Sequence, residues 1–174
     1  RGITPKIAIA LLRAGATVIT TGDHIWDQRE IVDFLPTEPR LLRPLNYPDN
    51  TPGHGSIVLE TDKGPLAVIN AQGRTFMNPP LENPLIAIDE ELKKLKEQLN
   101  LKMIFLDFHA EATSEKIATA RYLDGRVSAV VGTHTHVQTA DEQIFPDGTA
   151  FLCDAGMCGP KESILGRRIE PILY

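Results

Sequence analysis

The chain has 174 residues, of which 42% are hydrophobic and 24% are charged, and its formal net charge is -5. This length is enough to bury the core of one globular domain, so we expect a single domain over residues 1–174. The charge is not arranged as a basic stripe, and a polymeric nucleic-acid partner is therefore not indicated. No apolar run approaches the roughly 20 residues that span a bilayer, so we expect no membrane association.

The two cysteines, Cys153 and Cys158, lie close together in one expected loop. A single C-x4-C pair is weak evidence for zinc, because a zinc site usually needs a second pair. We interpret both as free thiols of a reducing compartment, which predicts a cytoplasmic protein. The oligomeric state is left open, a homo-oligomer included.

The N-terminal third predicts helix, strand, helix and loop. Thr4-Pro5 supplies a capping residue and a first-turn proline, so a helix begins there and ends near Gly15. An apolar strand is expected at 16–21. Asp27 can cap a second helix that Pro36 would end, and the proline-rich stretch 36–55 is expected to be loop.

The rest of the chain alternates strands and helices. We expect a hairpin around 61–64, an amphipathic helix near 86–99, a strand at 102–107, a helix near 114–123, a strand at 127–131 and a hairpin around 146–148. Such alternation predicts a layered α/β domain with a mixed sheet.

Four of the five histidines lie just past three apolar strands. They are His24, His109, His134 and His136. One histidine after a strand is usually a loop residue, but three such strand ends are harder to attribute to chance. Imidazole is a common ligand of divalent transition metals, and α/β sheets usually hold ligands at the carboxyl ends of parallel strands. If the strands are parallel neighbours, the four rings converge on a metal site. His54 lies in a turn-rich loop and is expected to be solvated.

Several strings of residues closely resemble the YmdB-like metallophosphoesterases, in order and through nearly the whole chain. They are G-D-H-I-W-D at 22–27, Q-G-R-T-F at 72–76, D-F-H-A-E-A-T-S-E-K at 107–116 and G-T-H-T-H-V-Q-T-A-D at 132–141. G-M-C-G-P at 156–160 also resembles a loop of that family, with cysteine where threonine is common.

The resemblance implies a calcineurin-like layered sandwich of mixed β-sheets flanked by helices, and a phosphodiesterase that uses two divalent metal ions. Mn, Fe, Zn and Mg all remain open as the metal. Small phosphodiesters, with 2′,3′-cyclic nucleotides foremost, are the implied substrates. By position, His109 and His134 would ligate one metal and His136 the other, while His24 would be the proton donor. Asp23 would be a ligand where asparagine is usual, and its added negative charge would weaken the metal as a Lewis acid.

General chemistry agrees with such a site. Two cations can share a hydroxide and neutralise charge on the phosphoryl oxygens, and His24 can protonate the departing alkoxide. Asp107 and Glu111 flank His109 and could either orient its imidazole or cap a helix. Arg74 could contact phosphate or form a surface salt bridge.

The family pattern also uses an N-terminal aspartate and a later glutamate-asparagine pair, for which no upstream residues exist here. The resemblance therefore implies a fragment that lacks the N-terminal metal-binding segment and is weakly active or inactive alone. Two alternatives are a non-enzymatic regulatory or binding module, and a CapA-like capsule-synthesis protein. The D-F-H-A-E-A-T string argues against the CapA-like alternative.

Overall fold

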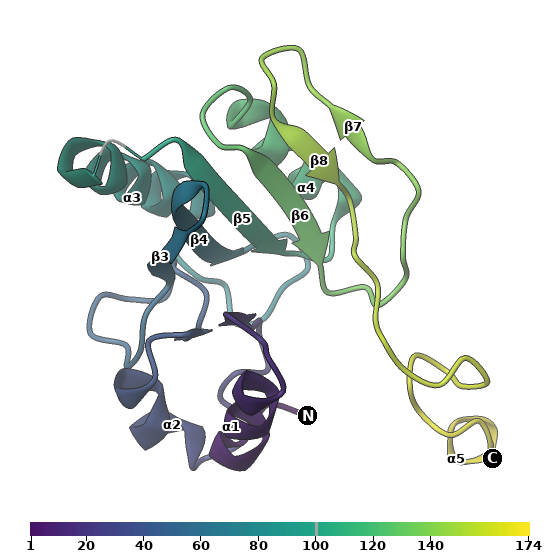
Figure 1. Cartoon of the computed structure of the whole chain (residues 1–174). Coiled ribbons are helices and arrows are strands. Elements are labelled where there is room, and N and C mark those ends of the chain that lie inside the picture. The colour runs from purple at the N-terminus through teal and green to yellow at the C-terminus, as the bar shows by residue number, and fades with distance from the viewer. Residues whose placement is uncertain (100) are drawn as a thin grey trace.

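The computed structural model describes residues 1–99 and 101–174, and a six-stranded mixed sheet forms its centre (Figure 1). The strand order is β3-β4-β5-β6-β8-β7. The four inner strands are parallel, and the two edge strands pair antiparallel to their neighbours. The bounds are Ser56–Thr61 (β3), Gly64–Gln72 (β4), Met103–His109 (β5), Ala129–Thr133 (β6), Gln143–Ile144 (β7) and Ala150–Leu152 (β8). The predicted α/β class with a mixed sheet is confirmed.

Helices make both connections between the inner strands β4, β5 and β6. Helix α3 (Pro84–Leu99) connects β4 to β5, and α4 (Thr113–Tyr122) connects β5 to β6. In α3, Ile88, Leu92 and Leu95 recur at helical spacing and are buried in the same cluster as the sheet's inner side chains. Burying each such side chain contributes roughly 1.5–3 kcal/mol, so this face holds α3 in place.

Both predicted hairpins are confirmed. Thr61 pairs with Gly64 across a two-residue turn, and the Thr61 hydroxyl donates to the Gly64 carbonyl at 2.6 Å. The second hairpin joins β7 to β8, and Phe145 stacks on Phe151 with ring centroids 5.4 Å apart.

A separate small unit lies below the carboxyl ends of β4 and β5 (Figure 1). It holds helix α1 (Pro5–Arg13), whose predicted cap is confirmed because the Thr4 hydroxyl accepts from the Ile7 N–H at 3.2 Å. Strand β1 (Ile19–Thr20) pairs in parallel with β2 (Leu41–Leu42) as a two-stranded sheet. The strand expected at 16–21 is therefore shorter, and the stretch expected to be entirely loop contains a strand.

The condition set for convergence, that the three strands before the histidines are parallel neighbours, is met by β5 and β6 but not by β1, which lies outside the six-stranded sheet. Asn70 of β4 connects the two sheets instead. Its side-chain amide donates to the backbone carbonyls of Thr21, at 2.8 Å, and Leu42, at 3.3 Å. Because Asn70 is fully buried, these bonds fix where β1 ends relative to the large sheet.

The second predicted helix begins later than expected. Helix α2 spans Ile31–Phe34, and the side chain of its N-cap residue, Glu30, makes no capping hydrogen bond. Pro36 lies inside a following 3-10 helix (η1, Leu35–Thr37), because a proline in the first turn of a helix costs no internal hydrogen bond. Asp27 does not cap α2, and its carboxylate contacts His24 instead.

A last short helix, α5 (Glu170–Leu173), ends the chain. Within residues 1–99 and 101–174, we find no helix with the length and apolar character needed to cross a membrane.

Candidate metal centre

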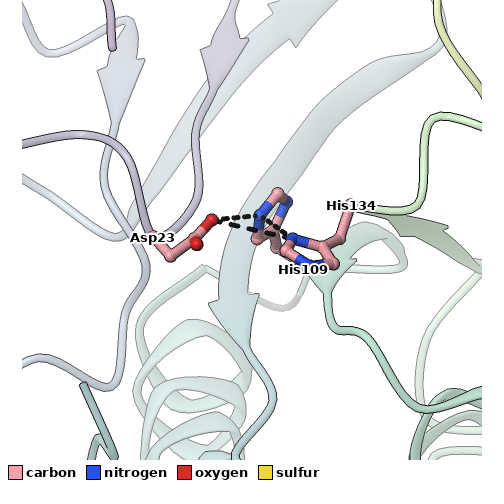
Figure 2. Close-up of side chains that lie close together, drawn as sticks. All are labelled: Asp23, His109 and His134. Carbon is pink, nitrogen blue, oxygen red and sulfur yellow. Dashed lines mark hydrogen bonds and ion pairs between the residues drawn. The ribbon is translucent and has the colours of Figure 1, made fainter. Parts of the chain in front are cut away.

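Asp23, His109 and His134 converge on one point at the carboxyl edge of the sheet (Figure 2). His109 is the last residue of β5, His134 directly follows β6, and Asp23 lies three residues past β1. Their facing atoms are close together: Asp23 Oδ1 lies 3.0 Å from His109 Nε2 and 3.6 Å from His134 Nδ1. The two imidazole nitrogens are 3.1 Å apart.

These distances fit the ligands of one metal ion. Bonds from a divalent metal to nitrogen or oxygen are about 2.0–2.2 Å long, so neighbouring ligand atoms lie roughly 3.0–3.5 Å apart. The donor set of two imidazoles and a carboxylate suits zinc, iron and manganese. The side chains of all three residues are partly buried, which limits competition from bulk water. Without a metal, a proton on His109 Nε2 joins the ring to Asp23 Oδ1; a bound metal ion would take the place of that proton.

A hydrogen-bonded chain orients the His109 ring. The Thr133 hydroxyl donates to the buried Asp107 carboxylate at 2.8 Å, so its oxygen is left to accept from His109 Nδ1 at 3.0 Å. This leaves Nε2 as the nitrogen that faces Asp23 and His134. Of the two roles left open for Asp107, orienting His109 or capping a helix, the first applies, through Thr133 rather than directly. Burial raises the pKa of Asp107 above its ordinary 3.8.

Glu111 orients a different ring from the one expected. Its carboxylate lies 3.1 Å from His134 Nε2, which leaves His134 Nδ1 to face the centre. Two roles were left open for Glu111, orienting His109 or capping a helix; its carboxylate contacts His134 instead, and the N-cap residue of α4 is Ala112. Both histidines thus have the nitrogen remote from the centre held by an oxygen.

The charges favour the metal-binding forms of these groups. The hydrogen bond from His109 lowers the pKa of Asp23 below its usual 3.8, although burial opposes this effect, so the carboxylate is ionised. Burial, together with the neighbouring His109, lowers the pKa of His134 below 6.5 and keeps its imidazole neutral at neutral pH. An ionised carboxylate and a neutral imidazole are the states that ligate metals.

Gly22 permits this close approach. A Cβ atom at this position would lie 2.1 Å from His109 Nε2, well inside van der Waals contact. The glycine that begins the G-D-H string is thus required because the His109 ring occupies the space beside its Cα.

A cavity of about 670 Å³ contains the three-residue group and also exposes His24 and His136. His24 Nδ1 lies 3.0 Å from the Asp27 carboxylate, and its Nε2 lies 3.8 Å from Asp23. His136 lines the cavity but does not belong to the three-residue group. The roles predicted for His24 and His136 stay predictions.

Arg74 lies away from this cavity. It lines a different one with Glu115, whose carboxylate accepts from the backbone N–H groups of Arg74 and Thr75. Arg167 lines the metal-centre cavity instead, from a tight turn in which it pairs with Ile164. No motif in the sequence distinguishes Arg167 from its neighbour Arg168.

Two further residues of this region, Lys116 and Asp154, carry no functional signal in the sequence; they form a buried ion pair at 2.8 Å. Lys116 ends the D-F-H-A-E-A-T-S-E-K string, but a helical lysine is ordinarily solvated, so the string alone gave no sign of its burial.

A sequence model described as YmdB-like protein matches residues 1–174. The chain belongs to the YmdB-like family. This assignment agrees with the predicted resemblance and leaves the CapA-like alternative without support.

Similar proteins within this family come from several bacteria. The 2′,3′-cyclic-nucleotide 2′-phosphodiesterase of Bacillus subtilis (strain 168) is 51% identical over 173 residues, which cover 99% of this chain and 64% of that protein. A crystal structure of a hypothetical protein from Thermus thermophilus has a TM-score of 0.90 at 41% identity, over 99% of this chain and 66% of that one. The chain thus spans about two thirds of the length of these relatives.

Two further structures support the fold. One is of a novel phosphatase from Mycoplasma pneumoniae, with a TM-score of 0.88 at 36% identity over 99% of this chain and 62% of that one. The other, described as a candidate 5′-nucleotidase of Staphylococcus aureus, has a TM-score of 0.64 at 14% identity over 88% of this chain and 35% of that one. At 14% identity, the likeness to the Staphylococcus aureus structure concerns the fold alone. The predicted calcineurin-like α/β fold is confirmed.

Proposed function

We propose that the protein is a metal-dependent phosphodiesterase that hydrolyses small phosphodiesters, with 2′,3′-cyclic nucleotides as substrates. One observation carries the proposal: Asp23, His109 and His134 face one point, in a family whose 51% identical member is named for that activity. The Mycoplasma pneumoniae structure, described as a phosphatase, supports the same class of chemistry. The proposal concerns the whole gene product, since the chain spans 64% of the Bacillus subtilis protein.

We assign the roles as follows. Asp23, His109 and His134 would hold one divalent metal ion, and His136, which lines the same cavity, would help to hold a second. When bound, such ions polarise the phosphate and lower the pKa of a water molecule. Manganese, iron, zinc and magnesium are all compatible with these imidazole and carboxylate donors.

His24 would protonate the departing alkoxide. The Asp27 carboxylate, 3.0 Å from Nδ1, orients the ring so that Nε2 faces the cavity beside Asp23. In the free protein Nε2 faces Arg1 Nη1 at 3.3 Å. A ring that donates from Nδ1 to Asp27 and also carries a proton at Nε2 is an imidazolium, which can pass that proton to the alkoxide. Arg167, which also lines the cavity, would add a positive charge for a substrate that carries one negative charge.

The test is manganese-dependent hydrolysis of a 2′,3′-cyclic nucleotide by the full-length gene product, beside the 174-residue chain and a His24→Ala variant. We expect kcat to fall about 100- to 10,000-fold in the variant, the usual contribution of a general acid. His54→Ala is the matched control, because His54 is exposed and does not line the cavity.

A second substrate separates the acid role from a structural one. Nitrophenolate departs without protonation, so the His24→Ala variant should retain most of its activity on bis(p-nitrophenyl) phosphate. A folded, metal-loaded, full-length protein with no activity on either substrate would refute the proposal and favour a regulatory or binding module.

A further inference from the structure

Lys116 of α4 and Asp154, which follows β8, form an ion pair behind the cavity. Lys116 Nζ donates to Asp154 Oδ2 at 2.8 Å, and the side chains are only 1% and 2% exposed. A buried ion pair contributes little net stability, because the desolvation of both charges offsets their attraction. Net stability therefore does not explain why the Lys116–Asp154 pair is buried at this position.

The Asp154 carboxylate also holds the loop that carries the metal-binding histidines. Its Oδ2 accepts from the backbone N–H of Thr135 at 3.1 Å and from the Thr135 hydroxyl at 2.8 Å. Its Oδ1 accepts from the Gly156 N–H at 2.8 Å. With the bond from Lys116, four donors converge on one carboxylate, and two of them belong to the residue between His134 and His136.

That loop has a backbone that needs support. His134 has a φ of 113° and His136 a φ of 66°, both in the region that favours glycine. Non-glycine residues hold such conformations only where surrounding contacts determine them. Thr135 lies between these two histidines. Its two hydrogen bonds to Asp154 hold the backbone of residues 134–136 in place.

The Lys116 side chain packs against strand β6 at Gly132. A Cβ atom at Gly132 would lie 2.9 Å from Lys116 Cδ and 1.8 Å from the Cys153 carbonyl oxygen. The aliphatic part of the Lys116 side chain thus lies against the end of β6, the strand that precedes His134. Strand, lysine, aspartate and loop form one packed unit.

We propose that the Lys116–Asp154 pair is a positioning device that sets the direction of the His134 ring toward Asp23 and His109. This inference rests on the proposed function of the metal centre. Lys116 and Asp154 touch neither metal nor substrate and act through Thr135. Partners behind the ligands of a metal site typically change its affinity 10- to 100-fold when they are removed.

The test measures Mn²⁺ affinity by titration calorimetry in the full-length gene product, for the unaltered protein, Lys116→Met, Asp154→Asn and Thr135→Val. We expect 10- to 100-fold weaker binding in the first two variants. Thr135→Val keeps the shape of the side chain and the ion pair but removes one bond to Asp154, so a smaller loss is expected. It also keeps the inference testable if the other variants fail to fold.

Leu92→Ala is the control for destabilisation, since Leu92 is buried in α3 and lies outside the cavity. Its Mn²⁺ affinity should match that of the unaltered protein at a temperature where all variants are folded. Mn²⁺ binding that is unchanged in the folded Lys116 and Asp154 variants would overturn the inference while leaving the proposed function intact.

A measurement without metal tests the positioning of the His134 ring independently of metal binding. NMR signals of the His134 ring should shift in Asp154→Asn, while those of His54 should not. Failure of the unaltered protein to bind Mn²⁺ would count against the proposed function alone. Unchanged His134 ring signals would overturn the positioning role whatever the protein binds.

Discussion

At the scale of single residues, the centre depends on small groups as much as on its ligands. The Thr133 hydroxyl lies between Asp107 and His109, and Gly22 leaves room for the His109 ring. The histidines that follow strands could be predicted from the sequence, because strand ends and imidazoles are visible in it. Thr133 and Asp154 could not, since their importance arises only from contacts between residues distant in the sequence.

Gly22→Ala should impair metal binding far more than folding. The added Cβ would lie 2.1 Å from His109 Nε2, and the ring can move aside at little cost in stability, but it would then leave the position facing Asp23. We expect Mn²⁺ affinity to fall about 10- to 100-fold by calorimetry, as when a ligand's support is removed. Gly159→Ala is the control, because that glycine does not line the cavity. Equal affinity in the two variants would contradict the prediction.

Asp154 should make the stability depend on pH in the acid range. Burial alone would raise the pKa of Asp154, but the hydrogen bonds from Lys116, Gly156 and Thr135 outweigh it and the pKa lies below 3.8. The unfolded chain then takes up this proton at a higher pH than the folded chain does, so this contribution to the unfolding free energy is present above 3.8 and is lost as the pH falls through the lower folded pKa.

Urea denaturation of the unaltered protein and Asp154→Asn measures that contribution. The variant should be less stable by about 3 kcal/mol at pH 7, the usual cost of breaking a buried pair, and the difference should shrink below about pH 4. A difference that stays constant down to about pH 3 would be inconsistent with a lowered pKa of Asp154.

At the scale of elements, the sequence predicted best where a pattern extends over many residues. The buried face of α3 and the two hairpin turns are of this kind, because their periodicity and turn residues act locally. Strand β2 was not predicted because two leucines are too few to show an alternating pattern of apolar and polar residues. They become a strand only by pairing with β1 in the folded protein. The later start of α2 has a similar cause, since Asp27 interacts with His24 rather than with the helix.

Leu92→Ala should weaken the fold without altering the centre. Leu92 is 2% exposed in the main hydrophobic cluster, and truncation of such a leucine costs about 2–5 kcal/mol. Urea denaturation should show this loss. Glu97→Ala, on an exposed part of the same helix, should stay within about 0.5 kcal/mol of the unaltered protein. Equal stability of the two variants would mean that α3 does not pack as described.

At the scale of the whole molecule, the centre lies between two hydrophobic clusters. One cluster contains the inner sheet with α3, and the other contains α1, β2 and the residues around α2. Asp23 comes from the second unit, whereas His109 and His134 come from the six-stranded sheet. The expectation of a single domain, and those of a cytoplasmic location and a homo-oligomer, stay predictions.

A bound metal should therefore stabilise the protein as a whole. Mn²⁺ at about 100 times its Kd should raise the unfolding free energy by about 2.7 kcal/mol, since it binds the folded state alone. Thermal denaturation with and without a chelator measures this effect. Asp23→Asn should reduce it, because asparagine lacks the negative charge. The same stabilisation in a His109→Ala/His134→Ala double variant would place the metal elsewhere.

The three converging side chains occupy positions 23, 109 and 134 of the chain. During synthesis on the ribosome, the first of them emerges more than a hundred residues before the last. Asp23 alone offers a metal no more than any solvated carboxylate does, and the centre cannot exist until His134 has left the exit tunnel and β6 has docked beside β5. A metal would therefore be held by all three side chains only after β6 has paired with β5, and not while the earlier strands alone are folded.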